Sequence, residues 1–501
     1  MAVDTSVVES PGWWMSYLSG LLASRQDQLE LLWNYYQGNP PMPTGAENAR
    51  PVFQAFQRKA RSNFAALIVD AMVERLRVRA IRTAVDNDDD GDADAWALFR
   101  RNRLHLGLGD TIRWATLFGE SYMSAQAPRV AGQRAVILPE HPAQTIAVTS
   151  PENPYQPRAA LKMVNDPVTG IDRAHLWLPG TNGTPARHYV AARKARRSSQ
   201  LFGLARIPRF NGASYEEELA ENLRTQRVPI VPFRNPEGVG EFLPHLDILD
   251  RINHMLLQRM VIATLQAFRQ RAVKGDLPDV DDAGRPVDYD AIFSSDPGAL
   301  WRLPAGVEMW ESGQADLTPM LTSVKDDVLH LAAASRTPLS MFTPDAATQS
   351  AEGAQLQREA HVFKVEDRQD RHGESAAVTI ATAYEMEGDT ERANLDVLSI
   401  DWSPAERFSL AEKAQAAQAA TASGVPWRAR AADIWQKDPA DVDRWEAMRL
   451  EDAALVPITA AGRSSTATSG QNASTRAVAA NPAVQQTVAA QLAAAAQQDG
   501  A

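Results

Sequence analysis

One acidic run holds the residues of this chain that are best spaced for metal chemistry. Residues 86–94 read DNDDDGDAD. Asp86, Asp88, Asp90 and Gly91 fit positions 1, 3, 5 and 6 of a calcium loop, but Ala97 stands at position 12, where such a loop needs a bidentate Glu. Because that ligand is missing, the pattern favours an acidic linker that caps the next helix, with a calcium loop as the alternative.

Other catalytic signatures are absent from the sequence. There is no GxxxxGK[ST] phosphate loop, no GxSxG elbow and no HExxH zinc pair. A metal-dependent nuclease built on the acidic run is the enzymatic alternative, but no His or Glu stands at ligand spacing around it. The nine histidines are scattered, and we expect them at surfaces or interfaces: His105, His141, His175, His188, His245, His254, His330, His361 and His372. The sequence therefore predicts no enzyme and no cofactor.

Composition limits the class of protein. A chain of 501 residues exceeds one core and predicts two to four structural units. Hydrophobic residues at 44% and charged residues at 23% exclude global disorder. The absence of cysteine excludes disulfides and thiolate chemistry. The first ten residues have no basic side chain, and no apolar run reaches about 18 residues, so we expect neither a signal peptide nor a membrane span.

The net charge of −11 argues against tight binding to DNA, because such binding depends on Lys and Arg displacing counterions from phosphates. A surface past which DNA must slide would carry this sign. Two basic clusters are exceptions, and we interpret them as solvated faces or as partners of acidic regions at subunit interfaces, with phosphate contact as the alternative. The clusters are Arg50, Arg58, Lys59, Arg61, Arg75, Arg77, Arg79 and Arg82, and Arg187, Arg193, Lys194, Arg196, Arg197, Arg206 and Arg209.

The elements that could position a functional surface are two helical runs around a compact acidic insert. Helical spacing of apolar residues predicts a helix over Pro244–Arg271, about 27 residues or roughly 40 Å long. A second helix is predicted from Thr318, as its capping residue, to Thr337, where Pro338 ends it. Such rods are stable when packed beside copies of themselves, with Leu256 and Val328 as core positions, and this favours a symmetric ring.

The rest of the chain is predicted to be mixed but mainly helical, an α+β fold. Helical stripes run to about Phe118, and short alternating strands follow from Ser121 to Ala192. A long helix is predicted from Ser350, and Ser403-Pro404 is predicted to open an alanine-rich one. Beyond Pro457 the composition falls to Ala, Gln, Ser and Thr, which predicts a tail that does not fold alone.

Four short motifs, in this order, resemble the portal (head-to-tail connector) proteins of long-tailed double-stranded-DNA phages, especially the branch in phages of actinobacteria. The resemblance covers roughly Pro11 to Asp452, and the rod–insert–rod pattern lies between its third and fourth motifs. The motifs are Tyr35-Tyr36-Gln37-Gly38, Asn63-Phe64 with Ile68-Val69-Asp70, Gly119-Glu120-Ser121-Tyr122, and Thr337-Pro338-Leu339 with Gln349-Ser350-Ala351-Glu352-Gly353.

The resemblance implies a portal fold with wing, stem helices, clip and tunnel loop. Its parts map onto 1–243 (N-terminal wing), 244–272 (stem helix), 273–317 (clip), 318–336 (second stem helix), 337–349 (tunnel loop), 350–456 (C-terminal wing and crown helices) and 457–501 (tail). The implied DNA-facing residues are Met341, Phe342, Thr343, Pro344, Asp345, Gln349, Lys325 and Arg336, with Asp326 and Asp327 limiting phosphate contact at Lys325. The implied partner-facing clip residues are Asp279, Asp281, Asp282 and Asp288.

The resemblance also implies a biological setting. Portals form homo-oligomeric rings, typically dodecamers, at one capsid vertex of the virion, after assembly in the host cytoplasm. Their implied partners are double-stranded DNA in the channel, the terminase large subunit, the major capsid and scaffold proteins, and a head-completion adaptor, with no membrane. The tunnel loop has no Lys or Arg between Leu339 and Gln349, so steric contact with DNA is expected there. Another capsid or tail structural protein is the structural alternative.

Overall fold

A computed structural model describes most of the chain. The described residues are 2–42, 51–86, 91–128, 130, 132–166, 168–194, 200–201, 204–205, 210–267, 271–275, 279–280, 284–289, 308–311, 313, 316–342, 351–406, 410–437 and 439–461. Residues 1–442 belong to one compact unit and residues 443–501 to a second. Helix α14 (Pro439–Ala461) supplies the described part of the second unit.

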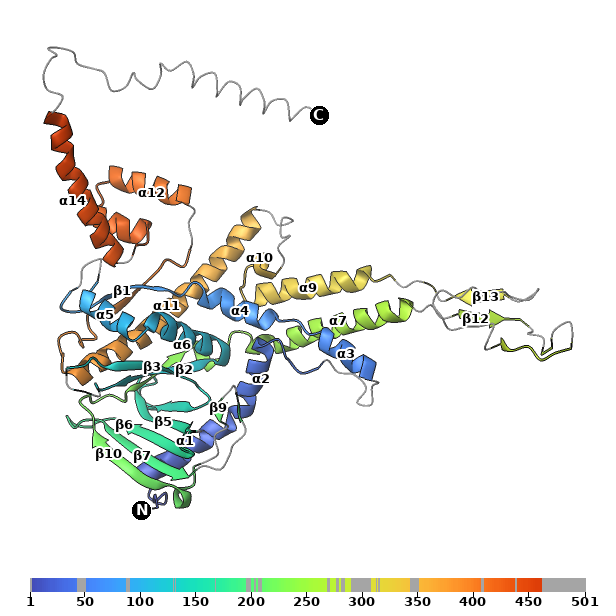
Figure 1. The fold of residues 1–501 in the computed structure, drawn as a ribbon, viewed down its shortest axis with the longest axis horizontal. Helices are drawn as coiled ribbons and strands as arrows, with labels where there is room; N and C mark the ends of the chain where they lie inside the picture. Colours follow the sequence, from blue (N-terminus) through green and yellow to red (C-terminus); the bar gives the residue numbers. More distant parts are fainter. Residues whose placement is uncertain are drawn as a thin grey trace, which may run out of the picture. The chain divides into compact units, whose positions relative to one another are not determined.

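The first unit is built in four layers (Figure 1). Helix α1 (Pro11–Ser24) covers one face of a five-stranded antiparallel sheet, and a three-stranded antiparallel sheet packs on the other face. The five-stranded sheet has the order β10 (Glu216–Asn222), β7 (Arg187–Lys194), β6 (Ile171–Leu178), β5 (Pro157–Asp166) and β4 (Thr145–Thr149). The three-stranded sheet has the order β11 (Ile230–Arg234), β2 (Glu120–Gln126) and β3 (Val136–Glu140).

Helices form the fourth layer and supply the largest core. They are α2 (Gln26–Tyr36), α4 (Phe64–Val73), α5 (Ala93–Arg101), α6 (Leu104–Phe118) and α11 (Ala351–Glu387), joined by the strand pair β1 (Val78–Arg82) and β14 (Ser399–Trp402). The remaining α-helices are α3 (Pro51–Lys59), α7 (Leu246–Ala267), α9 (Thr318–Ala334), α10 (Leu339–Phe342), α12 (Leu410–Ala422) and α13 (Trp427–Ala429), which a π-helical turn (Arg430–Ile434) follows. Two further strand pairs are β8 (Gln200–Leu201) with β9 (Leu204–Ala205) and β12 (Arg271–Lys274) with β13 (Glu308–Glu311). The 3₁₀ turns are Gly212–Ser214, Pro236–Gly238 and Leu243–His245. The expected mainly helical α+β fold is confirmed.

The strands of the larger sheet follow the alternation of their side chains. In β6, Ala174 and Leu176 are buried toward α1, whereas Trp177 faces the smaller sheet and packs near Tyr122 of β2. Residues that alternate in this way fit a sheet that is covered on both faces. Strand β10 lacks this signal because all seven of its residues are exposed. It forms by pairing with β7, and its Glu218 bonds to Arg173 of β6.

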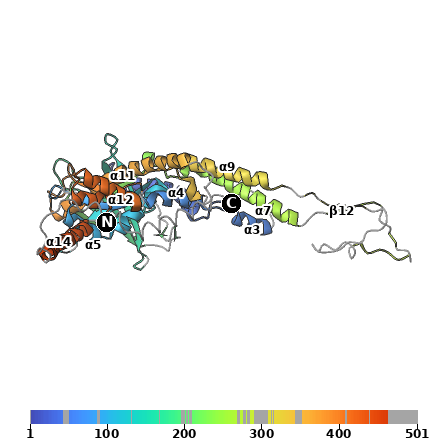
Figure 2. The ribbon, with the colours of Figure 1, turned by 90° about the horizontal axis from the view of Figure 1, so that it is seen from above.

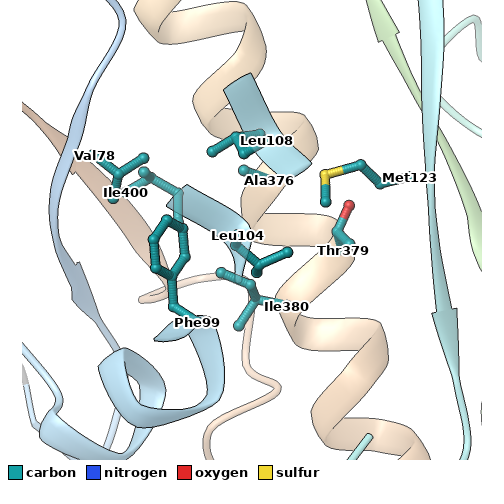
Figure 3. A pocket seen from close by; sticks show the side chains of 9 residues that line it. All are labelled: Val78, Phe99, Leu104, Leu108, Met123, Ala376, Thr379, Ile380 and Ile400. Carbon is teal, nitrogen blue, oxygen red and sulfur yellow. The ribbon is translucent and has the colours of Figure 1, made fainter. Parts of the chain in front are cut away.

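Helices α6 and α11 lie on the same face of the three-stranded sheet. Figure 3 shows Leu108 of α6, Ala376 and Ile380 of α11 and Met123 of β2 converging around a cavity of about 10 Å³. The lining is apolar apart from Thr379, and a volume of this size holds about one water molecule at most. The cavity is therefore a small packing defect between helices and sheet.

The acidic run at residues 86–94 ends in arginine ion pairs. The Asp92 side chain caps α5 by accepting from Asp94 N at 2.8 Å, and it accepts Arg392 Nε at 2.7 Å. Arg134 donates to both oxygens of Asp94 at 2.9 Å and to Glu387 at 3.0 Å. The interpretation as a capping segment is confirmed for Asp92, whereas Asp94 lies inside α5 and pairs with Arg134; residues 87–90 lie outside the described residues.

One predicted capping residue and one predicted helix start are wrong. Helix α9 begins at Thr318, as expected, but Thr318 is not its capping residue; the Thr318 N–H donates to the Asp316 carboxylate at 2.8 Å. Ser403 does not open α12, which begins at Leu410; the Ser403 N–H donates to Arg77 O at 2.7 Å and extends the β1–β14 pairing. In both cases the backbone N–H of the residue predicted to cap the helix donates to an acceptor outside that helix.

We expect Arg134→Met to lower the free energy of unfolding by about 1–3 kcal/mol near neutral pH, since Asp94 and the 14%-exposed Glu387 lose a shared cation. Hydrogen bonds from Arg134 lower the pKa of Asp94. A lowered carboxylate pKa contributes stability above the unfolded value of about 3.9 that is lost as the pH falls through the folded pKa. The difference between variant and parent should therefore shrink below about pH 4 in urea unfolding curves.

The matched control is Arg173→Met, which removes a more exposed pair with Glu218 and should lower stability less than Arg134→Met does. Equal costs for the two variants, or no pH dependence of the Arg134 effect, would contradict the assignment.

Candidate assembly and channel site

Helices α7 and α9 form an antiparallel pair, joined through the β12–β13 strand pair. They lie side by side in both views (Figures 1 and 2). Leu249 and Ile252 of α7 pack in one core with Val328 and Leu331 of α9, all at most 6% exposed. Val328 is thus buried within a single chain, as its apolar stripe suggests, and Leu256 is half-buried against the same core. Packing of either residue against a neighbouring subunit stays a prediction.

An ion pair links the two helices. Arg251 of α7 donates to Asp327 Oδ1 through Nε at 2.9 Å and Nη2 at 2.7 Å, and Asp327 is only 7% exposed. The expectation that Asp327 limits phosphate contact beside Lys325 is wrong for this reason. On a helix the two positions lie about 200° apart, so Lys325 is exposed while Asp327 faces α7.

Two family-like motifs hold the first turns of α7. The Tyr35 hydroxyl donates to Asp250 Oδ1 at 2.5 Å, which ties α2 to α7. Ser62, immediately before the Asn63-Phe64 motif, donates from both N and Oγ to Asn253 Oδ1, at 2.8 and 2.7 Å. Burial and the neighbouring Asp250 raise the pKa of Tyr35, so its hydroxyl stays a donor at neutral pH. The motifs therefore fix the base of the helix pair.

The end of α9 is held by α11. Lys364 Nζ donates to Ser335 O at 2.8 Å, and His361 places Nδ1 3.0 Å from Arg336 O. Lys364 also contacts Glu241 at 2.5 Å, and Arg368 contacts it at 2.7 Å. Burial raises the pKa of Glu241, but Lys364 and Arg368 outweigh burial, so the pKa lies below its usual value and the carboxylate is ionised.

The segment after α9 begins with the short helix α10, whose Leu339 and Phe342 side chains are buried in the core. Leu339 is 7% exposed and Phe342 9%, with the Phe342 ring 5.5 Å from that of Phe64 in α4. The Phe342 ring therefore packs within the chain, and its steric contact with DNA stays a prediction. Met341 is half-buried. The other predicted DNA-facing residues of this loop, Thr343, Pro344, Asp345 and Gln349, lie outside the described residues.

The insert between α7 and α9 contains strands that the sequence did not suggest. β12 and β13 pair in register, with exposed Lys274 opposite exposed Glu308. Opposite charges directly across a strand pair favour this register. Asp279 and Asp288 are exposed, whereas Asp281 and Asp282 lie outside the described residues. A partner-facing role for these acids stays a prediction.

The expected surface location of the histidines is wrong for two of them. His361 and His372 are 1% and 0% exposed in α11, and burial lowers the pKa of His372 to about 3. The apolar periodicity of α11 is interrupted at these positions, so the sequence did not mark them as core. Within the described parts of the chain, no group of three His, Asp or Glu is placed to hold a metal ion. No described helix is long and apolar enough to cross a bilayer.

The family model for "Phage portal protein, SPP1 Gp6-like" matches residues 22–454. The chain belongs to this family. It is a portal, or connector, protein and a structural component of the virion. The match spans the helix pair, the sequence on either side of it and the four motifs. No curated protein matches the chain.

Solved structures similar to this portal protein include the necks of two GTA particles. The neck of a native GTA particle computed with C12 symmetry shares 11% identity at a TM-score of 0.43, over 76% of this chain and 93% of that chain. The neck of an empty GTA particle computed with C6 symmetry shares 11% identity at a TM-score of 0.37, over 77% and 93%.

Sequence reasoning missed the polar contacts that hold this site together. Lys364 and Arg368 stand four residues apart on a predicted helix, a spacing that places both on one face, yet their buried partner Glu241 is over 100 residues away. Part of the first basic cluster forms ion pairs within the chain, because Arg79 and Arg82 both pair with Asp401. Paired arginines of this kind are not available to phosphate.

For the helix pair, we expect Leu331→Ala to lower the free energy of unfolding by about 2–5 kcal/mol, because Leu331 is 0% exposed and truncation leaves a cavity. Leu329→Ala removes a 42%-exposed side chain of the same size from the same helix and should change stability by less than about 0.5 kcal/mol. Chemical unfolding under non-assembling conditions measures both. Similar losses for the two variants would contradict the assigned face of α9.

Proposed function

We propose that this portal protein assembles into a closed ring, typically of twelve subunits, at one capsid vertex, and that the genome passes along the ring axis during packaging and ejection. Family membership supports this role. The structural observation that carries it is the incompletely buried helix pair. Met260 and Ile262 of α7 are half-buried, and Leu321 of α9 is 42% exposed. A two-helix extension has too few neighbours to cover these residues, and copies packed side by side would cover them.

In the proposed ring, residues 244–272 and 318–336 are the stem, 273–317 the clip and 337–349 the tunnel loop, between wing regions 1–243 and 350–456 and the tail 457–501. The clip would bind the terminase large subunit and later a head-completion adaptor, and the wing would meet the major capsid and scaffold proteins. Assembly would take place in the host cytoplasm. Membership of the actinobacteriophage branch rests on the four motifs alone.

The channel is proposed to be low in friction and to perform no catalysis. Exposed Lys325 and Arg336 are the basic residues assigned to it, and the exposed carboxylate of Asp326 lies beside Lys325 in sequence. With a net charge of −11, few phosphate contacts would have to be broken at each step of DNA movement. The motor that hydrolyses ATP would then be the terminase, and the portal would supply the passage.

Ring assembly is tested by light scattering coupled to size-exclusion chromatography, with electron microscopy of the peak. The wild-type protein should elute as a closed ring. Leu256→Asp should elute as monomers or aggregates, because the charge would lie at a half-buried apolar position of the stem. Gln258→Asp is the matched control on an exposed face of the same helix and should still form rings. Normal rings from Leu256→Asp would count against this placement of the stem.

DNA passage is tested by the affinity of assembled rings for linear duplex DNA. We expect dissociation constants weaker than about 1 μM near 0.15 M salt, since few phosphates would be neutralised. Submicromolar binding with a steep salt dependence would contradict the proposal that DNA passes without lasting phosphate contacts. ATP hydrolysis or DNA nicking that is lost on mutation of Asp86 would contradict the proposal that the protein performs no catalysis.

A further inference from the structure

One face of α11 is exposed along its first half and carries an aromatic ring among acids. Phe363 is 60% exposed, although the helix buries Val365 and His361 on its other side. Positions that share the outer face lie within an arc of about 80° at 100° per residue. These positions are Glu359, Phe363, Glu366, Asp370 and Glu374, and all are exposed. We refer to these five residues as the α11 stripe.

The acids of the α11 stripe have no counter-charge within the described residues. The ion pairs of this helix are made by other positions, such as Asp367 with Arg371 and Arg358 with Glu406. Phe363 also lines an open pocket of about 480 Å³ together with Pro244, Ala334 and Arg336. An exposed ring beside a pocket, flanked by uncompensated charge, is the composition of a docking face.

A surface of opposite character lies at the turn between α5 and α6. Arg100, Arg101, Arg103 and His105 are exposed, and Leu106 beside them is 60% exposed. No carboxylate of the described chain pairs with these three arginines. We call residues 100–106 the basic turn. It combines cations with one apolar side chain, and the α11 stripe combines anions with one aromatic side chain.

The two surfaces are anchored to opposite edges of the three-stranded sheet. Asn102 in the basic turn bonds to Ala135 O at 3.1 Å and accepts from Ile137 N at 3.0 Å, which holds the turn against β3. Ser375, next to the end of the stripe, donates to Pro232 O of β11 at 2.9 Å. Because β2 separates β11 from β3 and the α6–α11 core lies between the helices, the surfaces do not meet within one chain.

We propose that the α11 stripe of one copy docks the basic turn of a second copy. Arginines of the turn would pair with Glu366, Asp370 and Glu374, and Leu106 would pack on Phe363. Complementary patches on opposite edges of one subunit make a head-to-tail contact, which closes into a ring when the rotation fits. The inference rests on the proposed ring and names the surfaces that would hold its wing regions together.

Nucleic acid is disfavoured as the occupant of the α11 stripe, because four unpaired carboxylates repel phosphates. A basic partner protein would satisfy the charges, but this chain itself supplies the matching turn, with a matching apolar residue, at the opposite sheet edge. A separate partner is therefore treated as an outcome of the test.

The test is a charge swap measured on the full chain by native mass spectrometry and light scattering near 0.15 M salt. One variant carries Asp370→Lys and Glu374→Lys, a second carries Arg101→Glu and Arg103→Glu, and a third combines all four changes. The control carries Glu216→Lys and Glu217→Lys on β10, which reverses as many exposed acids elsewhere. Circular dichroism and thermal melts show that each variant folds.

Each of the first two variants should raise the protein concentration at which half of the subunits are assembled about tenfold or more, because like charges then face each other. The combined variant should return to within about threefold of wild type, and the control should match wild type. Phe363→Ala should weaken assembly about tenfold as well.

Unchanged assembly in either single-surface variant would overturn the inference, and in the stripe variant it would leave the stripe to a separate basic partner. A combined variant no better than its parents would also overturn it, because the two surfaces would then not face each other. In both cases normal wild-type rings would leave the proposed function standing, whereas a monomeric wild type would overturn the ring itself.

Discussion

The buried carboxylate of Glu241 constrains the arrangement of the whole helix pair. It is 8% exposed and is ionised between Lys364 and Arg368 of α11. Removing either cation would leave an uncompensated buried charge, which is far more costly than losing a surface pair. Lys364 also donates to Ser335 O at the end of α9, while Glu241 lies shortly before α7. One ion cluster thus fixes α11 to both helices of the extension at their base.

Beyond that base, α7 packs against α3 as well as against α9. The proximal half buries Ile252 and Leu331 completely, whereas apolar residues of the distal half remain partly exposed. Regions with few buried contacts open at low free energy unless neighbours cover them. A ring of packed copies would supply such neighbours, so assembly and local order of the stem are expected to be coupled.

Acidic and basic side chains occupy different parts of this portal protein. Many arginines that look available in the sequence are paired at the junctions between layers, among them Arg134, Arg392 and Arg79. Exposed acids gather on β10 and on the α11 stripe instead. The net charge of −11 is therefore expressed at the surface by exposed acids such as these.

Apolar periodicity determined α7, α9 and most of the alternating strands, because burial of one face is a local pattern of side chains. The four motifs predicted the family, and one of them has a local reason: Gly119 ends α6 with φ near 91° and sits against Gly238 O, where a Cβ would clash. Local patterns of this kind do not predict the all-exposed strand β10, the buried His361 or the inward-facing Phe342. Their positions depend on partners far away in the chain, such as Arg173, Arg336 and Phe64, and only the tertiary structure brings those partners together.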